Sequence, residues 1–292
     1  MLISIHTRCL TAKAGIETAM KQRIRPSAIA GSWYPGDPES LRSMIHRYLD
    51  AAVVPPVRKK ILGLISPHAG YAYSGQTAAF GYKLLSGTSF RTVVILSPMH
   101  RSPEARYNIP DADYYETPLG RVPVRHDLVD RVLSGLDAAR IQVDPEHSLE
   151  IQLPFLQIVL GRFDLVPVMI GYADVHHGGE IVENLVRIFS DEVLFIASSD
   201  LNHLTDYGAV VSADGCVLDA LRSNDLTSIR EALARRDSTV CGRVPITVLS
   251  EVAQKRGATS FSILDYRNSG DVTGEKGPGQ YTVGYLSGVF LG

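Results

Sequence analysis

Short, unbroken runs of apolar residues recur along the chain and predict the strands of a buried sheet. Four runs of about six residues show no alternation of apolar and polar positions: Ile61–Ser66, Thr92–Ser97, Leu165–Ile170 and Val193–Ser198. Such runs are typical of strands that are buried on both faces, as in parallel sheets. Two later segments, Ser260–Tyr266 and Tyr281–Leu291, are predicted to be closing strands.

Segments with helical character lie between and after these strands. The first is predicted over residues 38–52, because Asp37-Pro38-Glu39 supplies an N-cap, a proline at the first helical position and a first-turn acid. Further helices are predicted at Gly75–Leu85, Ser148–Leu160, His177–Phe189, Ala209–Leu221, Leu226–Arg235 and Pro245–Lys255. The alternation of strands and helices predicts an α/β fold built from βαβ units. Residues 271–280, which contain three glycines and a proline, are predicted to form a surface loop.

Composition excludes several classes of function. The net charge of −2 gives no basic excess for nucleic acid, and no apolar stretch reaches the ~18 residues of a membrane span. The first 20 residues lack the apolar core of a secretory signal. Three cysteines without framework spacing favour a reducing compartment, so we expect a cytoplasmic protein. We expect residues 1–24 to be an N-terminal extension and residues 25–292 to form one domain.

Three predicted strands are each followed by a histidine. His68 comes two residues after the first run, His100 three residues after the second, and His203 five residues after the fourth. Ligands of open α/β sheets bind outside the carboxyl ends of the strands. If the strands are parallel, these three histidines emerge at one edge of the sheet.

Asp200 and Cys241 are further candidates, each with a structural alternative. Asp200 precedes His203 by three residues and is expected to orient it as a general base, or to cap the following helix. Cys241 precedes Gly242, Arg243 and a helix expected from Pro245; the arginine and the helix N-terminus favour thiolate. The alternative is a small buried cysteine, which is the role we expect for Cys216 in mid-helix.

The segment His147-Ser148-Leu149-Glu150 has two interpretations. Ser148 caps a helix with Glu150 in its first turn, or His147 points into the site. We expect His147 and Glu150 to line the pocket, together with the aromatic residues Trp33, Tyr34 and Tyr71, with Tyr73 nearby.

Five motifs in a fixed order resemble the Memo family. They are Ala30-Gly31-Ser32-Trp33-Tyr34, Pro67-His68-Ala69-Gly70-Tyr71, Glu146-His147-Ser148-Leu149-Glu150, Ser198-Ser199-Asp200-Leu201-Asn202-His203 and Cys241-Gly242-Arg243-Val244-Pro245. The resemblance covers residue 25 to the C-terminus. It implies the fold of the class III extradiol dioxygenases, a central mixed and largely parallel sheet flanked by helices.

The resemblance also implies a metal site. The dioxygenases bind iron through two histidines and a glutamate, whereas Memo-like proteins have two histidines and a cysteine. By motif, the three ligands here are His68, His100 and Cys241, with His203 at the catalytic position and Asp200 beside it. Thiolate is softer than carboxylate, so copper or zinc are alternatives to iron, and the dioxygenase reaction does not follow from the fold. Bacterial and archaeal relatives imply a functional link to a radical-SAM protein.

Three functional hypotheses follow. The leading one is a redox protein or oxidoreductase with one non-haem iron or copper and an unknown small-molecule or peptide ligand. The alternative is a non-catalytic module that binds a peptide or protein in the same pocket. The third is a cysteine hydrolase that uses Cys241 and His203, which leaves His68 and His100 without a role.

Overall fold

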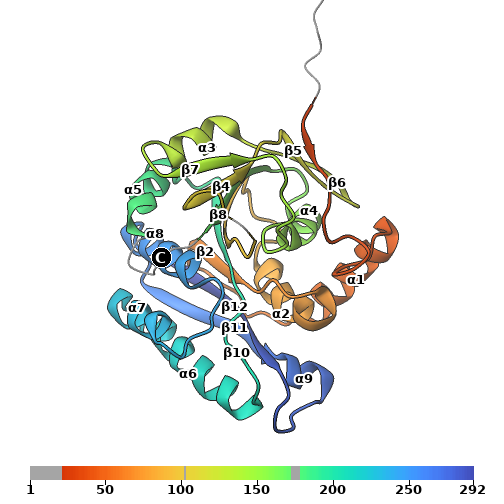
Figure 1. Cartoon of the computed structure of the whole chain (residues 1–292), viewed down its shortest axis with the longest axis vertical. Helices are drawn as coiled ribbons and strands as arrows, with labels where there is room; N and C mark the ends of the chain where they lie inside the picture. Colours follow the sequence, from red (N-terminus) through yellow and green to blue (C-terminus); the bar gives the residue numbers. More distant parts are fainter. Residues whose placement is uncertain (1–21, 102, 172–177) are drawn as a thin grey trace, which may run out of the picture.

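A mixed β-sheet forms the centre of the molecule, with helices on both of its faces (Figure 1). The computed structural model describes residues 22–101, 103–171 and 178–292. Within these residues the sheet has nine strands in the order β10-β12-β2-β9-β3-β8-β4-β7, with β11 paired to β12. They are β2 Ile61–Ser66, β3 Thr92–Pro98, β4 Tyr107–Pro110, β7 Ala138–Ile141, β8 Asp164–Ile170, β9 Val193–Ser198, β10 His203–Leu204, β11 Ser260–Asn268 and β12 Thr282–Leu291. A second sheet contains β1 Ile24–Arg25, β5 Tyr114–Thr117 and β6 Gly120–Pro123.

The four predicted apolar runs form the parallel centre of this sheet. β2 pairs with β9, β9 with β3, and β3 with β8, all in parallel. The α/β prediction and the parallel arrangement are therefore confirmed. Because β12 and β4 pair antiparallel with β2 and β8, the sheet as a whole is mixed. The carboxyl ends of β2, β3 and β9 lie at one edge.

Alternate residues of the central strands belong to two separate hydrophobic cores, one on each face of the sheet. In β3, Val93 and Ile95 face one core, whereas Val94 and Leu96 face the other. Helices α1, α2 and α4 contribute to the first core, and α3, α5, α6, α7 and α8 to the second. The helices are α1 Pro38–Ala51, α2 Tyr71–Leu84, α3 His126–Leu133, α4 Leu153–Val159, α5 Gly179–Ile188, α6 Tyr207–Ser223, α7 Leu226–Ala234, α8 Arg243–Lys255 and α9 Ser269–Thr273. This double burial explains why the central strands lack alternation.

The predicted helices are present, with shifted boundaries. Asp37 caps α1 by accepting a hydrogen bond from Ser40 N, as predicted. The predicted helix over residues 148–160 is instead a 3₁₀ turn, η1 Glu150–Gln152, followed by α4. Ser148 does not cap it, because its hydroxyl donates to Pro98 O. The predicted start of the 177–189 helix at His177 lies outside the described residues.

Three other differences concern the region between β3 and α4, the loop after residue 270 and the burial of Cys216. The segment between β3 and α4 contains β4, β5, β6, α3 and β7, none of which was predicted. The predicted loop after residue 270 includes most of α9, where Asn268 and Asp271 form a capping box. Cys216 is exposed on α6 rather than buried, because it lies on the face of the helix away from the core.

The N-terminal extension is described only in part. Residues 1–21, including Cys9, lie outside the described residues, whereas Ile24 and Arg25 form β1. Among the helices that the structure describes, none has the length and apolarity needed to cross a lipid bilayer.

Candidate metal centre

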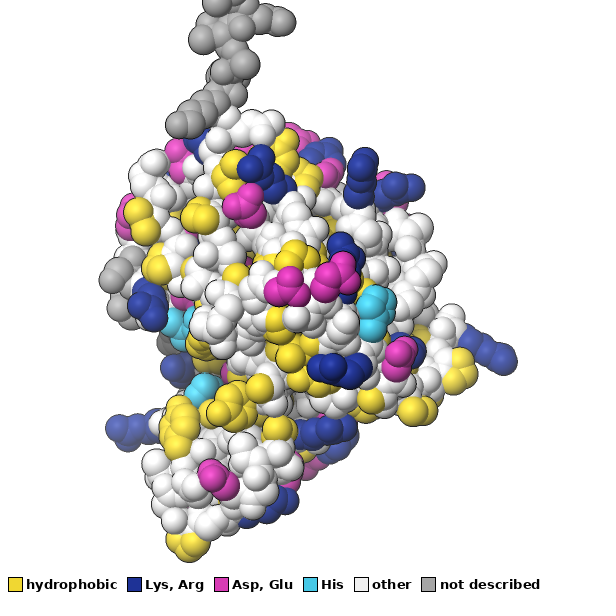
Figure 2. All heavy atoms as spheres, turned by 90° about the vertical axis from the view of Figure 1, so that its right-hand side faces the viewer, with side chains coloured by type: hydrophobic (Ala, Val, Ile, Leu, Met, Phe, Trp, Pro, Cys, Tyr) yellow, Lys and Arg dark blue, Asp and Glu magenta, His cyan; other side chains and the backbone are white. Residues whose placement is uncertain are grey.

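A pocket of about 730 Å³ opens at the carboxyl edge of the parallel strands. Its lining includes His68, His100, His147, His203 and Asp200. Figure 2 shows histidine side chains beside a recess between the main body of the molecule and the lobe below it. The histidines that follow three separate strands are therefore brought together, as expected from a parallel sheet.

His68, His100 and Cys241 form a group of potential metal ligands. One ligand atom from each residue lies within 4.8 Å of the other two. His68 Nε2 and Cys241 Sγ are 3.1 Å apart. His68 follows β2 directly and is 2% exposed, whereas the imidazole of His100, after β3, is 33% exposed. The group is thus buried on one side and open to the pocket on the other.

The hydrogen bonds around Ser198 determine which nitrogen of His68 carries the proton. Ser198 Oγ donates its single proton to Ser148 O at 2.6 Å and accepts from Gln152 Nε2 at 2.7 Å. It must therefore accept from His68 Nδ1, which lies 3.1 Å away. Burial holds the pKa of His68 well below its ordinary value, so the ring is neutral. The lone pair of Nε2 consequently points at Cys241.

Glu146 orients two further imidazoles. Its Oε1 lies 3.0 Å from His100 Nδ1 and 3.1 Å from His147 Nδ1, and its side chain is fully buried. The carboxylate also accepts from the backbone N–H groups of His100, His147 and Ser148. Burial alone would raise the pKa of Glu146, but the hydrogen bonds and the two imidazoles hold it well below the ordinary range. Since a carboxylate only accepts, His100 donates from Nδ1 and keeps Nε2 for the pocket, whereas His147 Nδ1 lies close to the same oxygen.

His203 reaches the pocket from β10. Its Nδ1 lies 3.0 Å from Tyr281 Oη, and its backbone N–H donates to Thr239 Oγ1 at 2.7 Å. Its Nε2 is buried and has no hydrogen-bond partner among the described residues. Burial, helped by His100, lowers the pKa of His203 to about 4. His203 therefore offers a neutral ring with a free nitrogen.

Asp200 does not orient His203, nor does it cap a helix. Its Oδ1 accepts from His68 N at 2.8 Å and Ala69 N at 3.3 Å, so it fixes the turn that carries His68. Burial raises the pKa of Asp200 to about 7, although these hydrogen bonds oppose the shift. The expected Asp200–His203 contact is not formed, because the Asp200 carboxylate accepts hydrogen bonds from the backbone of the turn after β2.

The surroundings of Cys241 differ from those expected. Burial raises the pKa of the Cys241 thiol well above its ordinary value, and the charge of Asp200 adds to this effect. Burial outweighs the helix N-terminus of α8 and Arg243, so without a metal the thiol keeps its proton. The histidine in contact with Sγ is His68, so the Cys241–His203 pair on which the hydrolase hypothesis rested is not formed.

The residues around the pocket divide into an exposed rim and a buried layer. Trp33, Tyr73 and Tyr281 are 36%, 48% and 62% exposed and line the pocket, as does His147. Trp33 packs on His147 with ring centroids 4.3 Å apart. By contrast Tyr34, Tyr71 and Glu150 are buried behind the pocket and do not line it. Glu150 accepts from Tyr34 Oη and pairs with Arg25.

Sequence reasoning missed Glu146, Ser198 and Tyr281 as site residues. Glu146 directly precedes His147. Ser198 is the last residue of a predicted buried strand, two residues before Asp200. Both therefore lie close in sequence to candidate residues. Tyr281 belongs to a segment far along the chain and gave no local signal. Their roles depend on contacts between distant segments.

Comparison with known proteins supplies a family for this arrangement. Residues 25–289 match the family described as Memo-like protein. The chain is 36% identical to a MEMO1 family protein of Thermotoga neapolitana, over 91% of this chain and 99% of that protein. It is 35% identical to one of Archaeoglobus fulgidus, over 91% and 99%, and 34% identical to one of Methanosarcina barkeri, over 86% and 95%.

A more distant likeness is to a solved structure, an uncharacterized protein of Escherichia coli K12. The two are 12% identical with a TM-score of 0.49, over 79% of this chain and 99% of that chain. The family match extends across all five sequence motifs and every residue of the candidate centre. On this basis the chain belongs to the Memo family.

Proposed function

We propose that this chain is a metal-dependent redox protein with one iron ion held by His68, His100 and Cys241, with copper or zinc as alternatives. The observation that carries the proposal is the convergence of three ligand atoms within 4.8 Å of one another. The lone pair of His68 Nε2, directed at Cys241 Sγ, supports it. The expected functional link to a radical-SAM protein stays a prediction.

The surrounding residues fit a bound ion. Ligating histidines usually donate their other ring nitrogen to an acceptor that fixes the ring, and here Ser198 and Glu146 accept from His68 and His100. Two imidazoles and one thiolate suit iron, copper or zinc rather than calcium or magnesium. A bound cation would stabilise the thiolate against the burial that otherwise keeps Cys241 protonated.

A bound ion would supply electron transfer or polarisation of a ligand. The chain's own residues would transfer protons, position the ligands and shield the pocket from water. His203 Nε2, neutral and without a partner among the described residues, would accept a proton from a ligand or return one to it. Asp200 would hold the His68 turn in place. Trp33 and Tyr73 would cover a ligand at the pocket mouth and limit its contact with water.

The test is metal analysis of protein purified without oxygen, since a thiolate ligand oxidises readily. We expect one ion per chain in the wild type and a sharp loss in His68→Ala, His100→Ala and Cys241→Ser. Cys216→Ser is the matched control, because Cys216 is an exposed cysteine on α6. Unchanged metal stoichiometry in Cys241→Ser after reloading would contradict the proposed ligand set.

A second candidate function is a module that binds a peptide or a partner protein in the same pocket. The exposed rings of Trp33, Tyr73 and Tyr281 at the pocket mouth favour it, since aromatic residues are enriched at recognition surfaces. A pull-down that survives His68→Ala with Cys241→Ala, but fails in Trp33→Ala, would support this function over a metal-dependent one.

A further inference from the structure

A second hollow lies at the opposite end of the parallel strands from the metal centre. It has a volume of about 720 Å³ and lies between α1, the β5–β6 hairpin, the end of α4 and the starts of β3 and β8. We call it the arginine hollow, after Arg42, Arg91 and Arg162 in its lining. Arg91 directly precedes β3, whereas His100 follows it, so the length of a strand separates the two sites.

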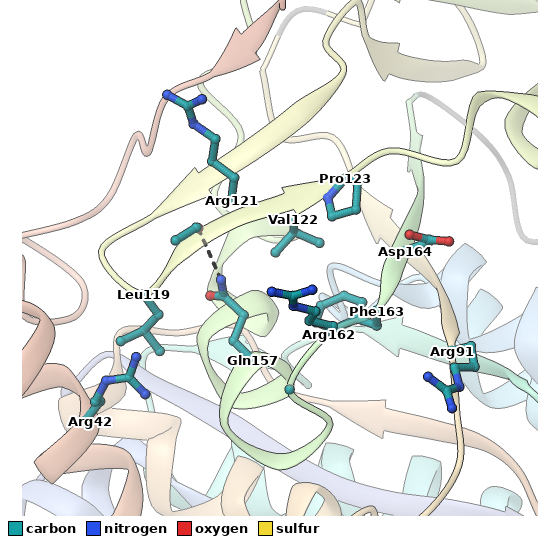
Figure 3. Close-up of a pocket in the computed structure, with 12 residues that line it drawn as sticks. Arg42, Arg91, Leu119, Arg121, Val122, Pro123, Gln157, Arg162, Phe163 and Asp164 are labelled. Carbon is teal, nitrogen blue, oxygen red and sulfur yellow. Dashed lines mark hydrogen bonds between the residues drawn. The ribbon is translucent and has the colours of Figure 1, made fainter.

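The three arginines are exposed, and none has a carboxylate within 4.0 Å in the described part of the chain. They come from three separate segments, and Figure 3 shows them around the hollow. Arg121 provides a contrast, because it points away from the hollow and pairs with Glu116 at 3.1 Å. Among the lining residues the one carboxylate is Asp164, which lies 3.5 Å from Arg125. The hollow therefore has an unbalanced positive charge.

The wall of the arginine hollow is built rather than incidental. Gln157 on α4 donates from Nε2 to Gly120 O at 3.1 Å and accepts from Thr117 Oγ1 at 2.6 Å. These bonds tie the hairpin turn to the helix, as the dashed line in Figure 3 shows for one of them. Leu119 and the buried Phe163 add apolar surface. The volume lies within the ~300–1,000 Å³ typical of small-molecule pockets.

We propose that the arginine hollow binds a small molecule with a chain of phosphate groups. Guanidinium groups form paired hydrogen bonds with phosphate oxygens and stay charged at every physiological pH. Three such groups from separate segments match an extended, multiply charged anion better than a single carboxylate. An inorganic oligophosphate and a nucleoside triphosphate share this chemistry; Leu119 and Pro123 offer apolar contact to a base.

The test is isothermal titration of the full-length chain with tripolyphosphate and, separately, with a nucleoside triphosphate, at about 0.15 M salt. We expect saturable binding of one molecule per chain. Arg91→Gln and Arg162→Gln should each weaken it about tenfold or more, the loss expected for one charged hydrogen bond. Arg236→Gln is the matched control and should leave affinity unchanged, since Arg236 is an exposed arginine outside the hollow.

Cys241→Ser separates this proposal from the proposed function, because phosphate chains also chelate metal ions. Retained affinity in metal-free Cys241→Ser protein assigns the phosphate to the arginine hollow. Loss of binding in that variant, an equal loss in Arg236→Gln, or no saturable binding would each overturn the proposal. Tighter binding of the nucleotide than of tripolyphosphate identifies a nucleotide site; equal binding identifies the phosphate chain as the recognised group.

Discussion

One buried carboxylate determines how two imidazoles face the pocket. Glu146 Oε1 accepts from His100 Nδ1 at 3.0 Å and lies 3.1 Å from His147 Nδ1. His100 is a proposed ligand, whereas His147 packs under Trp33. Glu146 is therefore a positioning residue that acts through its neighbours.

Replacing Glu146 by Gln should weaken metal binding without unfolding the chain. The amide keeps the shape but loses the charge that holds both imidazoles, and losses of about 10- to 100-fold in metal affinity are usual for such partners. Competition titration with a chelator measures the effect. The matched control is Glu150→Gln, also fully buried but bound to Arg25, which should lower the melting temperature and spare the metal affinity.

For individual residues, the sequence predicted the site residues that follow strands. It missed the residues whose role is to form contacts between distant segments. His68 and His100 were predictable because strand ends share an edge. The positions of Tyr34, Tyr71 and Glu150 behind the pocket were not predictable, because a sequence motif does not indicate how deeply a side chain is buried. Glu146 required knowledge of the loop that turns it toward His100.

The turn that carries Cys241 depends on the close approach of two elements. A Cβ atom at Gly242 would lie 2.4 Å from Ser199 Cβ and 2.7 Å from Ser198 O. Gly242 N also donates to Ser199 Oγ at 3.0 Å. The start of α8 thus rests directly on the end of β9, which holds Sγ next to His68.

Gly242→Ala should displace this turn and cost both stability and metal affinity. Overpacking of this kind costs about 1–3 kcal/mol in unfolding free energy. Denaturant unfolding and metal titration measure the two effects. Gly215→Ala on α6 is the control, since a Cβ there meets nothing within 4 Å and should stabilise slightly. A metal affinity unchanged in Gly242→Ala would show that the turn tolerates displacement.

Asp214 on α6 makes stability depend on pH in a predictable direction. It is fully buried and accepts from Asn202 N, Asn202 Nδ2 and Tyr266 Oη. Burial raises its pKa above the ordinary value of about 4. Between these two values the folded state binds more protons than the unfolded state, so this residue lowers stability as pH rises.

Asp214→Asn should remove this contribution. Relative to the variant, the wild type should lose unfolding free energy as pH is raised from about 4, and the difference should level off above the folded-state pKa. Urea unfolding at a series of pH values measures it. A constant difference would show that the hydrogen bonds to Asp214 balance its burial, and a change in the opposite sense would show that they outweigh it.

Elements with uniform burial were the predictable ones. β2 and β9 match their predicted bounds, since residues buried on both faces leave a continuous apolar run. The four-residue strands between 107 and 141 have too few residues for a pattern to emerge. β4 is buried throughout, whereas β5, β6 and β7 combine buried positions with partly or fully exposed ones. α2 begins at Tyr71, earlier than predicted, because the turn after His68 leads into it at once.

Across the whole molecule, a buried ion network joins the N-terminal strand to the loop that carries Glu146. Arg25, with a side chain 3% exposed, pairs with Asp144 and Glu150 and donates to Glu146 O. Both carboxylates are buried as well. The segment outside the main sheet is therefore tied to the loop that carries Glu146.

Arg25→Met should destabilise the fold strongly. It leaves two buried carboxylates without a cation, which costs about 3–5 kcal/mol. Arg23→Met is the control: Arg23 is 48% exposed where it pairs with Asp111 and Asp113, so its loss should cost under about 1 kcal/mol. Thermal unfolding compares them, and equal losses would mean that the buried network adds nothing.

The strand order has a consequence for biosynthesis. β9 lies between β2 and β3, although the ribosome makes it after both. Cys241 leaves the ribosome about 140 residues after His100, a delay of roughly 7–30 s at ordinary rates of synthesis. Throughout that interval the nascent chain holds two histidines and an incomplete sheet. With the proposed ligand set, metal loading would therefore belong to the last stage of the protein's production, once the thiol has joined the two imidazoles.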